Sequence, residues 1–265
     1  MKINANGILM NYEINGKGGN LVLIHGAGGN LNMWYHQVPA FSKSYCVITY
    51  DVRGAGETES PDTGYSMSLF IKDAYELMKA VGVEDAYFVG YSMGGRIAIE
   101  LAINYPKMVK ALILANSAMR PTRPSPETIE GWRTMLGLLD KGDIEKVAEI
   151  IAIGAFSPGF DSKNPTEFER YRNVVLRNKP DGLARIMRSL FTPAAPPDLS
   201  KIKCPVLLII GSNDPNVGVE QGKKTHEEMA GSKLVILPTG HATAIELPDK
   251  FNSAVIEFLS ELRQG

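Results

Sequence analysis

The sequence predicts an α/β fold: a mostly parallel, doubly wound sheet of about eight strands with a helical cap inserted between two of them. Three observations predict it. Short apolar runs rich in Val, Ile and Leu alternate with longer segments whose apolar residues recur at helical intervals. Glycine-rich or polar turns follow several of those runs. One long segment without a convincing strand interrupts the alternation, and prolines bracket it.

Six apolar runs are interpreted as buried strands, because β-branched and aliphatic residues dominate strands that are covered on both faces. They are Leu21–His25, Cys46–Tyr50, Ala86–Gly90, Ala111–Ala115, Val206–Ile210 and Leu234–Leu237. Ahead of them, the run Ile8–Ile14 ends at Asn15-Gly16, which predicts an antiparallel hairpin at the sheet edge. Helical spacing predicts helices over Met67–Val81, Arg96–Asn104 and Asp249–Leu262.

The segment from Met119 to Asp198 breaks the alternation of strands and helices. Four short helices are predicted in it, over Glu127–Leu139, Ile144–Ile153, Thr166–Arg177 and Leu183–Leu190. We therefore predict a core domain of residues 1–118 and 199–265, with residues 119–198 inserted as a helical cap. An ordinary pair of long crossovers is the alternative.

The composition is that of a globular protein without a strong net charge. Hydrophobic residues make up 44% of the 265 residues, enough for one large domain or one domain with an insertion. With 28 basic and 29 acidic residues, no overall field favours nucleic acid or an anionic membrane as a partner. No signal peptide or membrane span is apparent, and Cys46 and Cys204 are interpreted as reduced thiols. We expect a soluble cytoplasmic protein.

Gly90-Tyr91-Ser92-Met93-Gly94 is the first motif that carries chemistry. A predicted strand leads directly into it and a predicted helix continues from it. Such a strand–turn–helix elbow holds the serine in a strained conformation and exposes its Oγ above the sheet edge. The flanking glycines avoid side-chain collisions across the turn. A helix-capping serine between tight-turn glycines is the alternative.

A second motif, His25-Gly26-Ala27-Gly28-Gly29, follows the predicted strand that ends at His25. The motif does not fit a phosphate-binding loop, because no Gly-Lys-Ser/Thr follows and the Gly-x-Gly-x-x-Gly spacing is absent. We predict instead that the amides of Ala27 and Met93 form an oxyanion hole. Each would donate a hydrogen bond to the alkoxide of a tetrahedral intermediate.

An acid and a base follow the last two predicted strands, at the sheet edge where Ser92 is expected. Asp214 lies in the turn after Val206–Ile210, and His241 comes shortly after Leu234–Leu237. A serine hydroxyl is a weak nucleophile and needs a base within hydrogen-bond reach, while a carboxylate fixes the imidazole tautomer and stabilises the imidazolium. The order Ser, Asp, His is the one expected for this arrangement.

Other histidines and acids are weaker candidates. His25 is expected to pack or hydrogen-bond locally, and His36 and His226 lack a strand-end position that would bring them to Ser92. Asp51 also ends a strand and is the main rival acid, but it is interpreted as a structural turn residue. The histidines are scattered and distant from the cysteines, so neither a metal nor a cofactor is expected.

Five motifs in this order resemble the successive landmarks of the α/β-hydrolase superfamily. They are His25-Gly26, Asp51–Gly56, Gly90–Gly95, Gly211–Asp214 and Gly240-His241. Within the superfamily the sequence is similar to small capped enzymes: carboxylesterases, 3-oxoadipate enol-lactonases and cofactor-free haloperoxidases. Trp34 fits that group, and a serine nucleophile argues against haloalkane dehalogenases and epoxide hydrolases. The resemblance implies the fold and the triad roles, and leaves the substrate open.

Substrate specificity is expected to come from the cap. Candidate substrate-binding residues are Trp34, Met119, Trp132, Met135, Leu136, Phe156, Phe160 and Met187, together with Ala27 and Met93. Packing within the cap is the alternative for each of them. The basic run from Arg170 to Arg188 either meets a substrate carboxylate, as an enol-lactonase would need, or forms a solvated helix face.

The predicted activity is hydrolysis of a small or medium carboxylic ester through an acyl-enzyme, with a small-molecule ester or lactone as the partner. A lactonase of the enol-lactonase type is the nearest alternative. A perhydrolase, in which peroxide replaces water at the acyl-enzyme, is another, and a hydrolase-fold ligand sensor is the remote one. The sequence does not indicate an oligomeric state.

Overall fold

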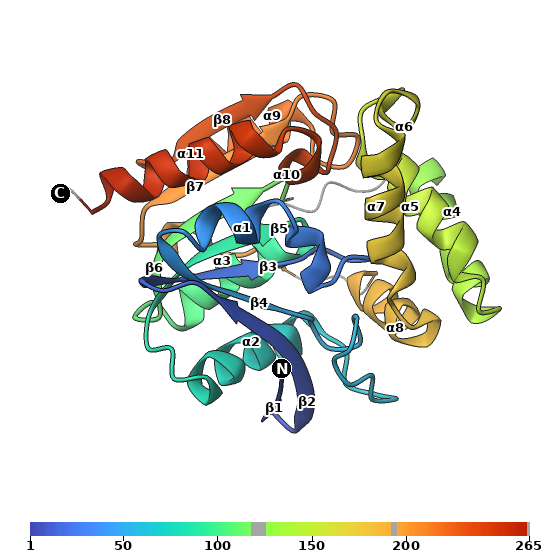
Figure 1. Ribbon diagram of the computed structural model, residues 1–265, viewed down its shortest axis with the longest axis horizontal. Helices are drawn as coiled ribbons and strands as arrows, with labels where there is room; N and C mark the ends of the chain where they lie inside the picture. Colours follow the sequence, from blue (N-terminus) through green and yellow to red (C-terminus); the bar gives the residue numbers. More distant parts are fainter. Residues whose placement is uncertain (118–125, 192–194, 264–265) are drawn as a thin grey trace.

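A twisted sheet of eight strands forms the centre of the molecule (Figure 1). The computed structural model describes residues 1–117, 126–191 and 195–263. The strands are β1 (Lys2–Ala5), β2 (Ile8–Asn15), β3 (Gly19–Ile24), β4 (Tyr45–Tyr50), β5 (Ala86–Tyr91), β6 (Val109–Ala115), β7 (Val206–Gly211) and β8 (Lys233–Leu237). Their order is β1-β2-β4-β3-β5-β6-β7-β8. The pairs β1/β2 and β2/β4 are antiparallel and all other neighbours are parallel, which confirms the predicted fold class.

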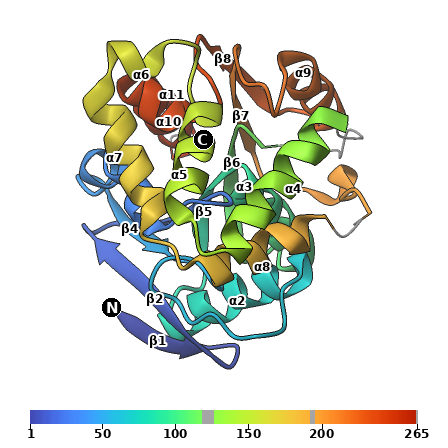
Figure 2. The same ribbon diagram turned by 90° about the vertical axis from the view of Figure 1, so that its right-hand side faces the viewer.

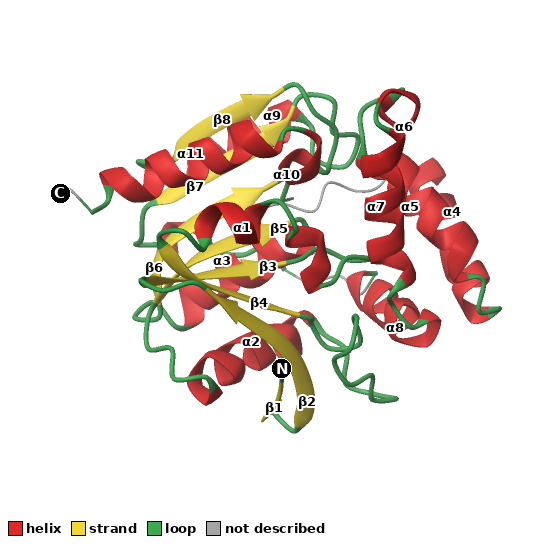
Figure 3. Ribbon diagram, viewed as in Figure 1, coloured by secondary structure: helices red, strands yellow, loops and turns green. Residues whose placement is uncertain are grey.

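Helices cover both faces of this sheet, which is why its central strands consist almost entirely of apolar residues (Figure 3). On one face lie α2 (Met67–Ala80) and α3 (Met93–Asn104), and on the other α1 (Gln37–Phe41) and α11 (Pro248–Glu261). Helix α9 (Val219–Glu228) packs beside β7 and β8. Phe251 of α11 is a fully buried example, and burying such a side chain contributes about 1.5–3 kcal/mol.

The antiparallel edge differs from the sequence prediction in its turn. The hairpin joins β1 to β2 through Asn6-Gly7, where both residues have positive φ (48° and 78°), as a type I′ turn requires. The predicted turn, Asn15-Gly16, leads instead into β3, which does not pair with β2. The prediction was wrong because both dipeptides suit a tight turn, and the four-residue β1 is too short to show a clear alternating pattern.

Five helices fill the described part of the chain between β6 and β7. They are α4 (Pro126–Asp140), α5 (Ile144–Ala155), α6 (Phe160–Lys163), α7 (Pro165–Leu176) and α8 (Pro180–Leu190). Four match the predicted helices, and α6 is an additional single turn. Figures 1 and 2 show this helical layer beyond the carboxyl ends of the parallel strands. The division into a core domain and a cap of residues 119–198 stays a prediction.

Short elements complete the described chain: η1 (Leu31–Trp34), η2 (Leu199–Lys201) and α10 (Thr243–Glu246). Cys46 and Cys204 are free thiols, each partly buried. Among the described residues, no helix combines the length and apolar character needed to cross a bilayer.

Candidate active site

Ser92 sits in a strained turn between β5 and α3. Its backbone has φ 53° and ψ −118°, a conformation that costs a non-glycine residue about 1–3 kcal/mol. Two backbone bonds hold it: Ser92 donates to the carbonyl of Ala115, and Gly95 donates to the carbonyl of Ser92, both at 3.0 Å. The strain is thus maintained by neighbouring backbone, as the predicted elbow requires.

The glycines of the motif are explained by close backbone approach. A Cβ at Gly94 would overlap the carbonyl oxygen of Ile24, so α3 can begin this close to the end of β3 only without a side chain there. A Cβ at Gly90 would lie 2.5 Å from the Gly94 carbonyl oxygen across the turn. The absence of a side chain at both positions therefore lets Ser92 lie at the end of β3.

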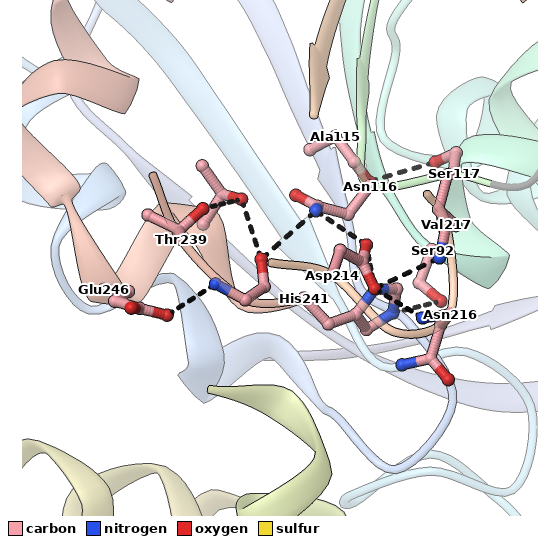
Figure 4. A network of polar contacts seen from close by, with 12 residues as sticks. Ser92, Ala115, Asn116, Ser117, Asp214, Asn216, Val217, Thr239, His241 and Glu246 are labelled. Atoms are coloured by element: carbon pink, nitrogen blue, oxygen red, sulfur yellow. Dashed lines mark hydrogen bonds and ion pairs between the residues drawn. The ribbon is translucent and has the colours of Figure 1, made fainter. Parts of the chain in front are cut away.

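Ser92, His241 and Asp214 form one hydrogen-bonded chain (Figure 4). The His241 Nε2 atom lies 3.0 Å from Ser92 Oγ, and its Nδ1 atom lies 2.8 Å from Asp214 Oδ2. Since a carboxylate only accepts, Nδ1 carries the proton and Nε2 is left to accept the serine hydroxyl. Ser92 and His241 are partly exposed, whereas the Asp214 side chain is fully buried. The three residues predicted from sequence are brought together.

The Asp214 carboxylate is held by four donors. His241 and the Asn116 side-chain amide donate to Oδ2, and the backbone amides of Asn216 and Val217 donate to Oδ1 (Figure 4). Burial by itself raises the pKa of this carboxyl group. The hydrogen bond and charge of His241, together with bonds from Asn116 and Asn216, more than offset burial and lower the pKa. Asp214 is therefore ionised at neutral pH.

Glu246 fixes the loop that carries His241. Its Oε2 atom accepts from the Gly240 amide at 2.8 Å and from the Ser157 amide at 3.1 Å. Ser157 follows α5, and the neighbouring Ala155 carbonyl accepts from the Ala242 amide at 2.7 Å. The histidine loop is thus bonded directly to the end of α5.

The turn after β3 lies against Ser92. Gly26 accepts from the Gly29 amide at 3.1 Å, and Gly28 has φ +82°, as a type II turn requires at its third residue. A Cβ at Gly26 would lie 3.0 Å from the Cβ of Ser92. The partly exposed Ala27 is the second residue of this turn, and its amide has no hydrogen-bond partner among the described residues.

The amide of Met93 is the other predicted donor. Met93 is the first residue of α3, so no carbonyl of its own helix can accept from its N–H group. The helix dipole adds a partial positive charge at this end. Two amides with no described partner therefore flank Ser92, as an oxyanion hole would require.

Two asparagines join the turn after β3 to α7. Asn30 donates through Nδ2 to the Val174 carbonyl at 2.6 Å. Asn178, just after α7, donates to the Gly28 carbonyl at 2.8 Å and accepts from the Gly56 amide at 2.8 Å. Both side chains are buried. They attach the helical layer to the turn that carries Ala27.

The remaining candidates have structural partners. Asp51 accepts from the Leu31 and Glu57 amides and from Asn11, which agrees with its interpretation as a turn residue. His36 pairs with Glu167, and His226 bonds Ser232.

Comparisons with known proteins agree with this geometry. Residues 19–143 match a family model described as alpha/beta hydrolase fold, and residues 189–264 match one described as TAP-like protein. The chain is 30% identical to 3-oxoadipate enol-lactonase 2 of Acinetobacter baylyi over 255 residues, which cover 96% of this chain and 94% of that protein. The chain belongs to the α/β-hydrolase family.

Two further relatives of this α/β hydrolase differ in their described substrates. It is 28% identical to a putative carbamate hydrolase RutD of Caulobacter sp., with 91% of this chain and 90% of that protein covered. The crystal structure of the enol-lactonase from Burkholderia xenovorans LB400 superposes with a TM-score of 0.90 at 28% identity, covering 98% and 100% of the two chains. All three relatives are named as hydrolases, but the names differ in the bond that is cleaved: a lactone in two of them and a carbamate in the third.

The burial of Trp34 contradicts its prediction as a substrate-binding residue. Its side chain exposes no surface and packs with Met33, Phe41 and other core residues beneath the sheet. A side chain with no accessible surface cannot line a cavity that a substrate enters. Trp34 therefore belongs to the core of this α/β hydrolase.

The predicted pocket residues of the cap that the structure describes lie in the helical layer. Met119 is outside the described residues. Phe156 and Phe160 stack at 4.2 Å inside an aromatic cluster, and Met187 packs with a second cluster that Met135 and Leu136 border. Trp132 is partly exposed and contacts Phe191 at 5.0 Å. The contacts of these residues are packing contacts within the layer, so their substrate-binding role stays a prediction.

Several arginines of the basic run on α7 and α8 are paired with this hydrolase's own acids, whereas Arg177 bonds the side-chain oxygen of Asn32. Arg172 bridges Glu145, Glu149 and Glu169, Arg185 pairs with Asp62 and Asp181, and Arg188 pairs with Asp140. The Arg170 guanidinium lies 3.7 Å from the Tyr35 ring centre. These contacts favour the solvated helix face over carboxylate recognition.

Three residues of the site were missed by sequence reasoning. Asn116 follows β6 at the same sheet edge, so the rule that polar residues at strand ends meet there would have found it. Glu246 and Asn178 act through contacts between segments far apart in the chain, and no local pattern marks them.

Proposed function

We propose that this α/β hydrolase cleaves carboxylic ester bonds through an acyl-enzyme formed on Ser92. The observation that carries the proposal is the Ser92–His241–Asp214 chain, with contacts of 3.0 and 2.8 Å. Beside it lie the amides of Ala27 and Met93, which have no hydrogen-bond partner among the described residues. A nucleophile, a base with fixed tautomer and donors for an oxyanion are the parts that acyl transfer needs.

In the acylation step, Ser92 Oγ attacks the ester carbonyl while His241 Nε2 accepts the hydroxyl proton. The carbonyl oxygen becomes an alkoxide, to which the Ala27 and Met93 amides donate. The imidazolium, stabilised by Asp214, then gives its proton to the leaving alkoxide, and the C–O bond breaks. An acyl group remains on Ser92, and the alcohol leaves.

In the deacylation step, water takes the place of the alcohol. His241 accepts a proton from water as its oxygen attacks the acyl carbonyl, and the second tetrahedral intermediate uses the same two amides. Its collapse returns the proton to Ser92 and releases the carboxylic acid. No further residue is needed for this half of the cycle.

A lactone is the second candidate substrate. Two of the three relatives above carry the name enol-lactonase, which favours a cyclic ester. Lactone opening uses the same steps, except that the released hydroxyl stays attached to the acyl chain. The ion pairs of Arg172, Arg185 and Arg188 favour an acyl group without a carboxylate.

The helices between β6 and β7 form the cap that selects the substrate in this proposal. Their ends contact both sides of the site, at Ser157 and at Asn178. The predicted cap side chains, such as Trp132 and Met135, are proposed to set the length of the acyl group that fits.

Hydrolysis of p-nitrophenyl esters from acetate to decanoate tests the proposal, with a lactone and an aryl carbamate of matched acyl size beside them. Wild-type turnover on esters or the lactone, lost in both Ser92→Ala and His241→Ala, is expected. Fluorophosphonate should label the wild type and leave Ser92→Ala unlabelled. Turnover of the carbamate alone, or unchanged activity in Ser92→Ala, would exclude ester hydrolysis by this site.

A further inference from the structure

His25 uses both of its ring nitrogens although it lies outside the triad. The Val52 amide donates to its Nε2 atom at 3.0 Å, and its Nδ1 atom lies 2.8 Å from the Gly26 carbonyl oxygen. The side chain is fully buried at the end of β3. Its ring orientation is thus fixed by the segment after β4 on one side and by the turn that carries Ala27 on the other.

These partners define the protonation state of the ring. Because the Val52 amide donates to it, Nε2 must be the unprotonated nitrogen, and Nδ1 must then carry the proton that it donates to the Gly26 carbonyl. Burial lowers the pKa of His25 more than the nearby Asp51 carboxylate raises it. The neutral Nδ1–H form is the one that fits this site.

The Gly26 carbonyl and the Ala27 N–H belong to the same peptide unit. A trans peptide is planar, so its C=O and N–H bonds point in opposite directions and rotate together. A hydrogen bond that holds the carbonyl therefore also sets the direction of the N–H group. Hydrogen bonds in a chain polarise one another, so the same bond makes this N–H a stronger donor.

We propose that His25 is a positioning residue that orients the Ala27 amide toward the oxyanion and strengthens it as a donor. This inference rests on the proposed function, because it requires an oxyanion at Ser92. The other donor, Met93, needs no such support, since its amide is fixed by the start of α3. Ala27 instead lies in a turn next to two glycines, where the Gly29 amide, at 3.1 Å, is the other described donor to the Gly26 carbonyl.

Two substitutions separate the two bonds of the ring. His25→Asn places an amide near the position of Nδ1 and keeps a donor for the Gly26 carbonyl. His25→Gln reaches the position of Nε2, keeps an acceptor for the Val52 amide and loses the donor to Gly26. The two variants are matched controls, because each keeps one bond of His25 and loses the other.

The expected result is a difference in transition-state binding between these variants. Loss of a whole oxyanion donor costs about 10²–10³-fold in kcat, so a misdirected donor should lower kcat of His25→Gln by roughly 10–100-fold, with KM changed less than about threefold. His25→Asn should stay within about fivefold of wild type. A trifluoromethyl ketone, whose adduct with Ser92 carries an oxyanion, should bind His25→Gln more weakly by the same factor as kcat/KM falls.

A purely structural role predicts a different pattern. Both variants would then lose activity in proportion to their unfolded fraction, and the ketone affinity of the folded protein would not change. Equal kcat in the folded Gln and Asn variants, or an unshifted ketone affinity in His25→Gln, would overturn the inference.

The wild-type protein supplies a measurement that does not depend on the folding of any variant. In ¹⁵N-histidine spectra, His25 should carry its proton on Nδ1, and its signal should shift when the ketone adduct forms. A proton on Nε2 would contradict the inference. Absence of wild-type ester or lactone hydrolysis and of fluorophosphonate labelling would instead count against the proposed function, which keeps the two failures distinguishable.

Discussion

Asn116 donates its side-chain amide to Asp214 Oδ2 at 2.8 Å, the same oxygen atom to which His241 donates. Asn116 is fully buried and has a positive φ of 45°. Like Ser92, it is a residue of the site whose backbone lies in the left-handed region. Its Oδ1 atom has no hydrogen-bond partner among the described residues. A strained, half-satisfied asparagine therefore orients the acid of the proposed triad.

Replacing Asn116 tests this positioning. Asn116→Ala and Asn116→Gly both remove the donor, so both should lower kcat, by roughly tenfold for a hydrogen bond to a charged group worth about 1.5 kcal/mol. Glycine tolerates the positive φ and alanine does not, so the Gly variant should be the more stable by about 1 kcal/mol. Steady-state kinetics and urea unfolding measure the two effects. Wild-type kcat in the Gly variant would show that the bond does not position Asp214.

Asp214→Asn should inactivate the protein while leaving its fold intact. An amide at this position can present its NH₂ group to His241 Nδ1, which stabilises the wrong tautomer and leaves Nε2 protonated. Loss of the orienting acid in this way lowers kcat by about 10⁴-fold in serine proteases. Rates on the best ester, together with circular dichroism of the variant, test this. Activity within tenfold of wild type would make another carboxylate the acid.

The lowered pKa of Asp214 makes stability depend on pH in a defined direction. Its pKa is below the ordinary value of 3.8 in the folded protein. The ionised form is therefore stabilised by folding. That contribution is fully present above the unfolded value and is lost as pH falls through the lowered folded value. Urea midpoints of wild type and Asp214→Asn should thus converge below about pH 4. A constant difference from pH 7 to pH 3 would contradict this.

Glu246 is predicted to act through the histidine loop. Glu246→Ala leaves the Gly240 and Ser157 amides without their acceptor, which costs about 1–3 kcal/mol of stability for each amide that stays dry. The His241 loop should become less ordered and kcat should fall. Glu246→Gln keeps an oxygen acceptor and should recover most of both losses. Thermal unfolding and kcat of the pair measure this; equal behaviour of Ala and Gln would point to the charge instead.

Gly94→Ala should be strongly destabilising, because its Cβ would overlap the Ile24 carbonyl oxygen and force α3 away from β3. Such overpacking costs about 1–3 kcal/mol. Gly131 in the interior of α4 is the matched control, since nothing lies within 4 Å of a Cβ built there, and the same substitution at Gly137 would fall in the last turn. Gly131→Ala should stabilise the protein by about 0.5–1 kcal/mol through helix propensity. Comparison of the two urea midpoints tests both.

The fold, and the meeting of Ser92, Asp214 and His241 at one sheet edge, could be predicted because they depend on local patterns. Apolar runs mark the central strands, and Ser92, Asp214 and His241 each follow such a run directly. Parallel strands bring their carboxyl ends to one edge, so sequence position alone places these side chains near one another. The hairpin turn was predicted at Asn15-Gly16 instead of Asn6-Gly7, because two equally good turn dipeptides flank β2.

The rest of the site depends on contacts that no local pattern encodes. Trp34 looks like a pocket residue by its distance from the turn, yet it points into the core. Glu246 and Asn178 each join segments that lie far apart in sequence or belong to different layers. The basic run suggested an anion site. Only the positions of Glu145, Asp62 and Asp140 show that three of its arginines are already paired with acids.

The bonds at the C-terminal ends of α5 and α7 limit how this protein can be re-engineered. The Ala155 carbonyl and the Ser157 amide hold the loop of His241, the proposed base, while Asn178 and the Val174 carbonyl hold the turn of Ala27, the proposed oxyanion donor. A chimera that receives these helices from a relative would therefore exchange part of the scaffold of both reacting groups. Such a chimera would change selectivity and turnover together, unless it keeps this protein's own residues at the four attachment points.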